Sequence, residues 1–370
     1  MQWFFFAKLY FPLLSVFLLS SIFDFTRRSI SKYFFLFSSI SFILFCFIVV
    51  AGGRIIDIGG DWSIYKANFD AAPRLFDFNS SFFYFEPGFL FLTSIIKTFS
   101  SNYVVFFIFV EMISCILMIL SINKYTENKI SSLCIYFSYM FISLNLNLIR
   151  TLLAVQIFFF SLRYIYNKNF FCYSICIFVA SSMHISSLIL FPLYFMLNKN
   201  IKKNTAILVI IGGMIMVLFR IDILRPILEL TPSSLGYIYT KVDSYLNSQT
   251  FGTAREFSFT HIEYLIFFVI IIRYRDWLNK HIPYFNIFFN MFMIYGVLLF
   301  YLFGVNAFSG RFKFFFLPSI VVIIPYFLKL FRRRFEFMFL FFSLYLIALS
   351  IYLVCYRETS MLLKYTNYFF

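Results

Sequence analysis

The chain has 370 residues, of which 62% are hydrophobic and 24% aromatic, while only 13% are charged. A soluble globular domain carries about 25% charged residues, so this composition excludes an ordinary water-soluble fold. The formal net charge of +15 would suit a nucleic-acid partner only if the basic residues clustered on a soluble module. Here they lie in short segments between apolar runs, so we expect no nucleic-acid binding.

Apolar runs long enough to cross a bilayer recur along the whole chain. Backbone polar groups in lipid must be satisfied within the segment, which selects helices. We therefore predict an all-α, polytopic integral membrane protein, a single transmembrane domain over 1–370 with about 12 transmembrane helices. No small-residue cleavage site follows the first run, so we expect a retained span rather than a signal peptide. The predicted spans are 4–22, 33–51, 103–121, 130–146, 150–166, 170–183, 184–197, 204–220, 261–273, 284–304, 311–329 and 337–355.

Some stretches do not fit a simple series of crossings. Residues 82–97 are apolar, but a full crossing there would reverse every later loop, so we predict a re-entrant or interfacial helix. The run 170–197 is too long for one span, and we predict two short helices that meet at His184. Segments 52–102, with short helices, and 221–260 are expected on the outer side, where long loops are more often functional than idle.

The distribution of basic residues supports this arrangement. If the segment with Arg27, Arg28 and Lys32 is cytoplasmic, the loops on that side hold more than half of the 31 lysines and arginines. The same loops hold only a quarter of the 16 acidic residues. Cytoplasmic loops of membrane proteins carry such an excess of positive charge, so the pattern supports the whole set of spans.

The six cysteines all fall within apolar runs, without the paired spacing or histidine neighbours of a disulfide framework or zinc site. We interpret them as small core hydrophobes and expect no metal and no cofactor. They are Cys46, Cys115, Cys134, Cys172, Cys176 and Cys355.

The first outer segment carries a candidate site. Arg54, Asp61 and Tyr65 lie beside glycines that allow close backbone approach to a ligand, and carboxylates there suit general-base work or sugar recognition. The alternative is a solvated loop whose charges only pair with one another. Glu86 differs, because an acid within an apolar stretch must find a partner or stay protonated.

Two further candidates lie at the ends of predicted spans. Arg150, near Asn145, Asn147 and Gln156, is an arginine in an otherwise apolar stretch, and its guanidinium could bind phosphate bidentately. The alternative is a snorkelling arginine at the interface. His184 lies among serines and could donate to phosphate or move a proton near neutral pH, although a satisfied core histidine is the alternative.

A fourth group of cations is expected on the same outer face. Arg311 and Lys313 lie at the start of the eleventh span, and Arg255 in the long outer loop could join them to make an anion-binding pocket. In the same loop region Asp243, Glu256 and His261 are additional candidates. Glu111, in the third span, is interpreted as a polar contact between helices.

The order of these motifs resembles the EpsG-like branch of the Wzy polysaccharide polymerases, which polymerise lipid-linked repeat units of O-antigen and exopolysaccharide. The shared features are an early segment with Arg54, Asp61 and Tyr65, then EPGF at Glu86, Arg150 with Ala154, His184 with Ser186, and GRF at Arg311. They span residues 54 to 315. Thr151 departs from the glutamine that often follows the arginine in the family.

The resemblance implies a metal-independent, inverting glycosyltransferase in the bacterial cytoplasmic (inner) membrane, with its active site facing the periplasm. Its substrate would be an undecaprenyl-diphosphate-linked oligosaccharide. A chain-length regulator protein and membrane lipids are the implied partners. The expected catalytic residues are Asp61, Glu86 and His184, and the expected residues for diphosphate and sugar binding are Arg54, Tyr65, Arg150, Arg255, Arg311 and Lys313.

Alternative functions remain open from the residues alone. A flippase or transporter for lipid-linked oligosaccharides would also have many spans, although such proteins usually show repeated halves, and none is detectable here. A ligase that hands O-antigen to lipid A would share the outer arginines and histidine. A membrane acyltransferase could use His184.

Overall fold

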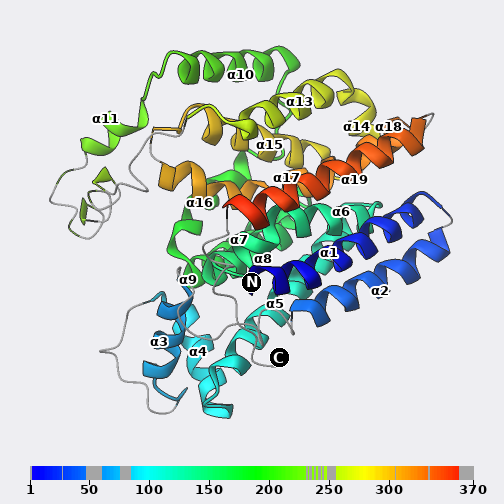
Figure 1. The fold of residues 1–370 in the computed structure, drawn as a ribbon. Helices are drawn as coiled ribbons and strands as arrows, with labels where there is room; N and C mark the ends of the chain where they lie inside the picture. Colours follow the sequence, from blue (N-terminus) through cyan, green and yellow to red (C-terminus); the bar gives the residue numbers. More distant parts are fainter. Residues whose placement is uncertain are drawn as a thin grey trace. The chain divides into compact units, whose positions relative to one another are not determined.

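A computed structural model describes residues 2–26, 28–46, 61–75, 85–230, 256–304, 306–331 and 334–357, together with single positions between 232 and 247 (Figure 1). The described part of the chain is helical and contains no strand. Its contacts divide the chain into two compact units, Met1–Tyr194 with Val321–Phe370, and Phe195–Ile320.

The first unit contains most of the described helices. They are α1 (Gln2–Ser21), α2 (Arg28–Cys46), α3 (Trp62–Ala71), α4 (Pro87–Phe99), α5 (Tyr103–Tyr125), α6 (Lys129–Tyr136), α7 (Ile142–Leu144), α8 (Ile149–Tyr166), α9 (Phe170–Met183), α18 (Pro325–Leu330) and α19 (Phe335–Tyr352). Irregular helical turns extend some of them: 3-10 helices at Ile22–Phe25 and Ile185–Phe195, and π-helical turns at Phe137–Phe141 and Leu353–Arg357.

The second unit contains α10 (Lys203–Leu218), α11 (Leu224–Glu229), α13 (Phe259–Arg273), α14 (Arg275–His281), α15 (Phe285–Phe300) and α16 (Asn306–Phe316). Helix α17 (Pro318–Ile323) contains the boundary between the units. Helix α15 packs against α10, α13 and α16. Asn290 on α15 donates to the carbonyls of Leu197 (2.8 Å) and Lys199 (2.7 Å), which ties the chain before α10 to this helix.

Length and hydropathy identify six helices in the described residues that could cross a membrane. They are Ala7–Phe25, Ser29–Cys46, Tyr103–Tyr125, Ile149–Tyr166, Gly310–Leu330 and Phe335–Cys355. The prediction of an all-helical, multi-pass membrane protein is therefore confirmed. The predicted count of about 12 crossings is not confirmed, because the other apolar helices are shorter than the roughly 20 residues that a full crossing needs.

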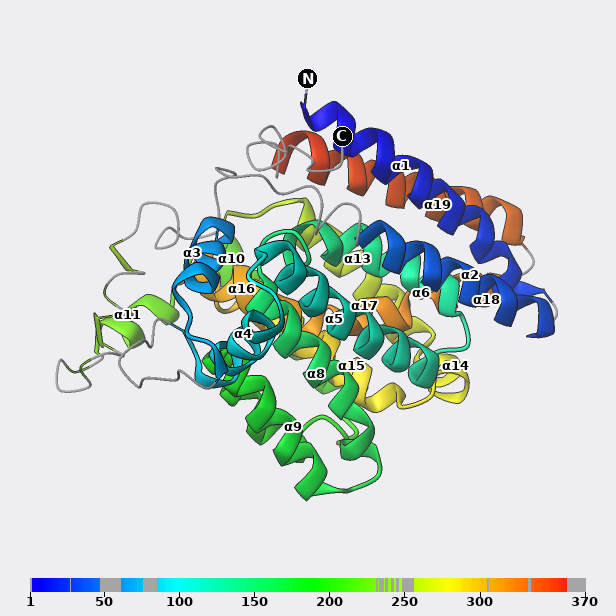
Figure 2. The ribbon, with the colours of Figure 1, turned by 90° about the horizontal axis from the view of Figure 1, so that it is seen from below.

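Helices α5, α8 and α9 form the centre of the first unit. In Figure 2 they lie side by side, and α8 packs against both of its neighbours. Asn102 begins α5 by accepting the Val104 N–H (2.9 Å), and Asn169 begins α9 by accepting the Cys172 N–H (3.0 Å). Such side-chain caps satisfy donors that the first helical turn leaves unpaired. Helices α3 and α4 pack against α5 and against each other.

The two stretches that did not fit a simple series of crossings, 82–97 and 170–197, contain the elements that position the site. Helix α4 begins at Pro87, where a missing N–H costs nothing, and has 13 residues. At 1.5 Å per residue it is about 20 Å long, too short to cross a bilayer. Its re-entrant or interfacial placement stays a prediction. In the 170–197 run, α9 and the following 3-10 helix meet at His184 as predicted, and His184 has extended backbone angles (φ −153°, ψ 109°).

Candidate functional site

Glu86 lies at the centre of a polar group in the first unit. Its Oε2 accepts a hydrogen bond from Arg150 Nη1 at 2.7 Å. Its Oε1 accepts the backbone N–H of Ile185 at 3.1 Å and lies 3.5 Å from His184 Nδ1. The side chains of Glu86, Arg150 and His184 are only 12%, 20% and 14% exposed. A carboxylate, a guanidinium and an imidazole from three distant parts of the chain therefore meet in one mostly buried place.

The ends of helices position these groups. Glu86 is the residue before the first turn of α4, and Arg150 lies in the first turn of α8. At the end of α9, the His184 N–H still bonds to the Ala180 carbonyl (2.9 Å), but the extended backbone of His184 stops the helix there. The Ile185 N–H then points to the Glu86 carboxylate.

Two aromatic rings lie close to the Arg150 guanidinium. The guanidinium carbon lies 4.1 Å from the Phe85 ring centre and 5.7 Å from that of Tyr65. A cation over an aromatic face is attracted by the negative face of the ring, more strongly where water is excluded. Tyr65, on α3, is almost fully buried, and its burial raises the pKa of the phenol to about 12. Tyr65 therefore stays a neutral partner of Arg150 at physiological pH.

Asp61 lies beside this group but its described hydrogen bond uses the backbone. The Asp61 N–H donates to Asn147 Oδ1 at 3.4 Å, which ties the start of α3 to the chain just before α8. This contact keeps α3, and with it Tyr65, next to Arg150. The catalytic role that the sequence predicts for the Asp61 carboxylate stays a prediction.

The ionisation of Glu86 follows from these partners. Burial alone would raise its pKa, but the His184 imidazole, the Arg150 charge and the Ile185 N–H together outweigh burial and lower the pKa from 4.5 to about 2. Hydrogen bonds and an opposite charge favour the ionised form. Glu86 is therefore a carboxylate throughout the physiological range.

This low pKa predicts a pH-dependent contribution to stability. A group whose pKa is lower in the folded protein stabilises it above the unfolded pKa, here 4.5, and loses that contribution as the pH falls toward about 2. We expect the thermal stability advantage of the wild type over Glu86→Gln, which does not titrate, to be constant above about pH 5 and to shrink below it. Thermal unfolding of both proteins in detergent, followed by intrinsic fluorescence, measures this. An advantage that is unchanged in acid would contradict the ion pair.

Gly88 allows α4 to lie close to α9. A Cβ atom at Gly88 would come within 2.2 Å of Ser182 Oγ, 2.7 Å of Ser182 Cβ and 3.0 Å of the Ser182 carbonyl oxygen. These distances leave no room for a methyl group, so any side chain at this position must push the start of α4 away from α9. Glu86, two residues earlier, would then move away from His184 and Ile185.

We expect Gly88→Ala to lower activity by up to about 100-fold, the effect of a displacement of roughly 1 Å at a reacting group. Activity normalised to the amount of protein in the membrane measures this. Ser182→Gly in the same protein removes the two shortest contacts, and we expect it to restore part of the loss. Wild-type activity of Gly88→Ala would show that the close approach of α4 to α9 is not needed.

The other predicted cations belong to the second unit or to parts of the chain outside the described residues. Arg311 and Lys313 are on α16 in the second unit, where Arg311 is half-buried and Lys313 is buried. Arg54 and Arg255 lie outside the described residues. Convergence of these four cations with the Glu86 group stays a prediction.

Several residues that the sequence grouped with the site have structural partners instead. Gln156 donates to the Tyr136 hydroxyl (2.9 Å), that hydroxyl donates to Asn145 Oδ1 (2.9 Å), and Asn145 donates to Glu111 (2.7 Å). These bonds join α5, α6 and α8 through Asn145, and none of these bonds involves Arg150. His261 forms a capping box with Ser258 at the start of α13, with its Nδ1 accepting the Ser258 N–H at 3.0 Å. Asp243 accepts a hydrogen bond from Asn247 (2.9 Å), and Glu256 is exposed.

Sequence reasoning missed two members of the site. Phe85 makes the closest aromatic contact with Arg150, and the only signal for it was its position next to Glu86. The Ile185 N–H could not have been found, because the predicted helix break at His184 does not show that the freed N–H points to Glu86.

The fold and the site define a class of protein. It is a multi-pass helical membrane protein in which a carboxylate, a guanidinium and an imidazole, all mostly buried, meet at helix ends. The chain belongs to the EpsG family, whose model matches residues 39–369 and so covers all three of these groups. This match confirms the resemblance drawn from the motifs and places the chain among membrane proteins of polysaccharide synthesis. No curated protein and no solved structure gave a significant match.

Proposed function

We propose that this protein polymerises undecaprenyl-diphosphate-linked oligosaccharide repeat units into O-antigen or exopolysaccharide at the periplasmic face of the bacterial inner membrane. The observation that carries the proposal is the meeting of Glu86, Arg150 and His184 at bonding distance. These residues belong to three separate motifs of the family resemblance, and glycosyl transfer needs a base for a hydroxyl and a cation for a leaving diphosphate.

The proposed step is a single displacement with inversion. The oxygen of an acceptor sugar hydroxyl forms the new bond to the anomeric carbon of the growing glycan. The bond between that carbon and the diphosphate oxygen breaks, and its electron pair stays on the undecaprenyl diphosphate. The hydroxyl proton passes to the Glu86 carboxylate, and Arg150 stabilises the negative charge that develops on the diphosphate.

The ion pair supplies a way to activate the base. With a pKa of about 2, Glu86 is a weak base while Arg150 and His184 hold it. Arg150 Nε is buried and has no hydrogen-bond partner among the described residues, so the guanidinium retains a donor for another anion. A diphosphate that competes for Arg150 would remove the main positive charge from Glu86 and raise its pKa. Substrate binding itself would thus make Glu86 a better base.

Purified protein in liposomes with a synthetic lipid-linked repeat unit tests the proposal. We expect longer lipid-linked glycans to form, detected by mass spectrometry. A fluorescent repeat unit added to one leaflet reports translocation in the same vesicles, and adding lipid A reports transfer to that acceptor. Translocation without elongation would identify a flippase, and glycan on lipid A without elongation would identify a ligase. Either result would overturn the proposal.

A further inference from the structure

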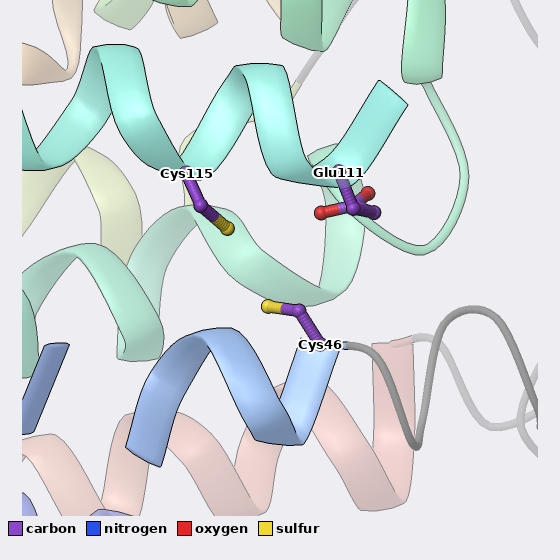
Figure 3. A group of neighbouring side chains, drawn as sticks. All are labelled: Cys46, Glu111 and Cys115. Atoms are coloured by element: carbon purple, nitrogen blue, oxygen red, sulfur yellow. The ribbon is translucent and has the colours of Figure 1, made fainter. Parts of the chain in front are cut away.

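A second cluster of reactive side chains lies in the first unit and shares no residue with the Glu86 group. Cys46 is the last residue of α2, and Glu111 and Cys115 are four residues apart on α5, so both project from the same face of that helix. The two sulfurs and a carboxylate oxygen all lie within 4.8 Å of one another. Figure 3 shows Glu111 and Cys115 on successive turns of α5, with Cys46 on the neighbouring helix.

All three side chains are buried, with residue exposures of 1% for Cys46, 3% for Glu111 and 2% for Cys115. Burial of several groups that can become anions in an apolar interior is costly unless a cation or hydrogen bonds compensate them. From the sequence, the two cysteines are interpreted as small core hydrophobes and Glu111 as a polar contact between helices. The structure puts them in one place, which neither interpretation required.

From this geometry we infer that Cys46, Glu111 and Cys115 bind a thiophilic divalent cation, such as Zn²⁺, that links α2 to α5. Two thiolates and one carboxylate are donors that zinc takes in proteins. A tetrahedral zinc ion with Zn–S distances of about 2.3 Å sets its two sulfurs about 3.8 Å apart. The present spacing reaches that geometry with small side-chain movements.

The surroundings of Glu111 support this inference. Asn145 Nδ2 donates to Glu111 Oε2 at 2.7 Å, and Tyr136 and Gln156 hold Asn145 in turn. Groups that orient a ligand in this way typically change metal affinity about 10- to 100-fold when they are removed. Because the site is built from α2 and α5 and does not include the Glu86 group, its role is to fix these helices, and it is independent of the proposed reaction.

Metal content of the full-length protein tests the inference. The protein is purified in detergent through an affinity tag without histidines, loaded with Zn²⁺ under reducing conditions, desalted and analysed by elemental mass spectrometry. We expect one Zn²⁺ per chain in the wild type and loss of that ion in Cys46→Ser/Cys115→Ser. The matched control is Cys172→Ser/Cys176→Ser, which removes the same number of thiols from α9, and we expect it to retain zinc.

Cobalt provides a readout that does not depend on the folding of a double variant. Loading the wild type with Co²⁺ should give the near-ultraviolet charge-transfer band of a cobalt–thiolate bond. Glu111→Gln keeps both thiols and should shift the visible spectrum and weaken retention, and Asn145→Ala should weaken it about 10- to 100-fold. Zinc content in the wild type no higher than in Cys46→Ser/Cys115→Ser would overturn the inference. So would a Co²⁺ spectrum without a thiolate band.

Discussion

Replacing Glu86 by Gln is expected to abolish the long polysaccharide ladder and leave single repeat units on the lipid carrier. The amide can still accept the Ile185 N–H, but it cannot take a proton or balance the charge of Arg150. A general base typically contributes about 100- to 10,000-fold to a rate, so a loss of about 100-fold or more is expected. The measurement is the chain-length distribution of surface polysaccharide in a deletion strain complemented with the variant.

Asp70→Asn is the matched control for this change. Asp70 lies on α3 close in sequence to the site, but it is 52% exposed and pairs with Lys66 one helical turn away (3.3 Å). Exposed pairs of this kind contribute little, so this variant should give the wild-type ladder. Size-exclusion profiles in detergent verify that Glu86→Gln still folds. A normal ladder from well-folded Glu86→Gln protein would remove Glu86 from the mechanism.

Replacing Arg150 by Lys is expected to have the second largest effect. Lysine keeps the positive charge but loses the planar guanidinium, whose carbon lies 4.1 Å from the Phe85 ring centre, and its extra N–H donors. If Arg150 binds the diphosphate of the substrate, the polymer should shorten strongly, with an activity loss of about 10- to 1,000-fold, comparable to the removal of one charge-stabilising donor. Polymer length at matched protein level measures this.

Arg163→Lys offers a control on the same helix. Arg163 lies in the last turn of α8, with its guanidinium 3.8 Å from the Phe160 ring centre and its Nε donating to the Phe160 carbonyl (2.9 Å). It therefore lies over an aromatic ring as Arg150 does, but it bonds to a backbone carbonyl and lies at the other end of α8. We expect Arg163→Lys to retain polymerisation. Equal losses in both variants would point to destabilisation of α8 rather than to substrate binding.

The long helices of the first unit could be predicted from the sequence because each is an apolar run between polar segments. The span predicted at 150–166 corresponds to α8, Ile149–Tyr166, and the span predicted at 103–121 to α5, Tyr103–Tyr125. The number of crossings could not be predicted, because several apolar runs form helices of only 10–17 residues, and hydropathy alone does not show whether such a run makes a full crossing.

The site could be predicted in part. Glu86, Arg150 and His184 stood out because each is a polar group in an apolar stretch, and the order of the motifs grouped them. Their pairing depends on how α4, α8 and α9 are rotated, which hydropathy does not determine. For the same reason Asn145, close to Arg150 in sequence, could not be assigned to Glu111 instead.

The interruption of the helix at His184 has a consequence for how the chain can change. In an unbroken helix the Ile185 amide would bond to the carbonyl four residues earlier and would not be available to a carboxylate. A substitution that extended α9 through His184 would thus strengthen the local helix but remove one of the hydrogen-bond donors to Glu86. A continuous helix through His184 would therefore be more regular, but the Glu86 carboxylate would lose a bond that the site uses.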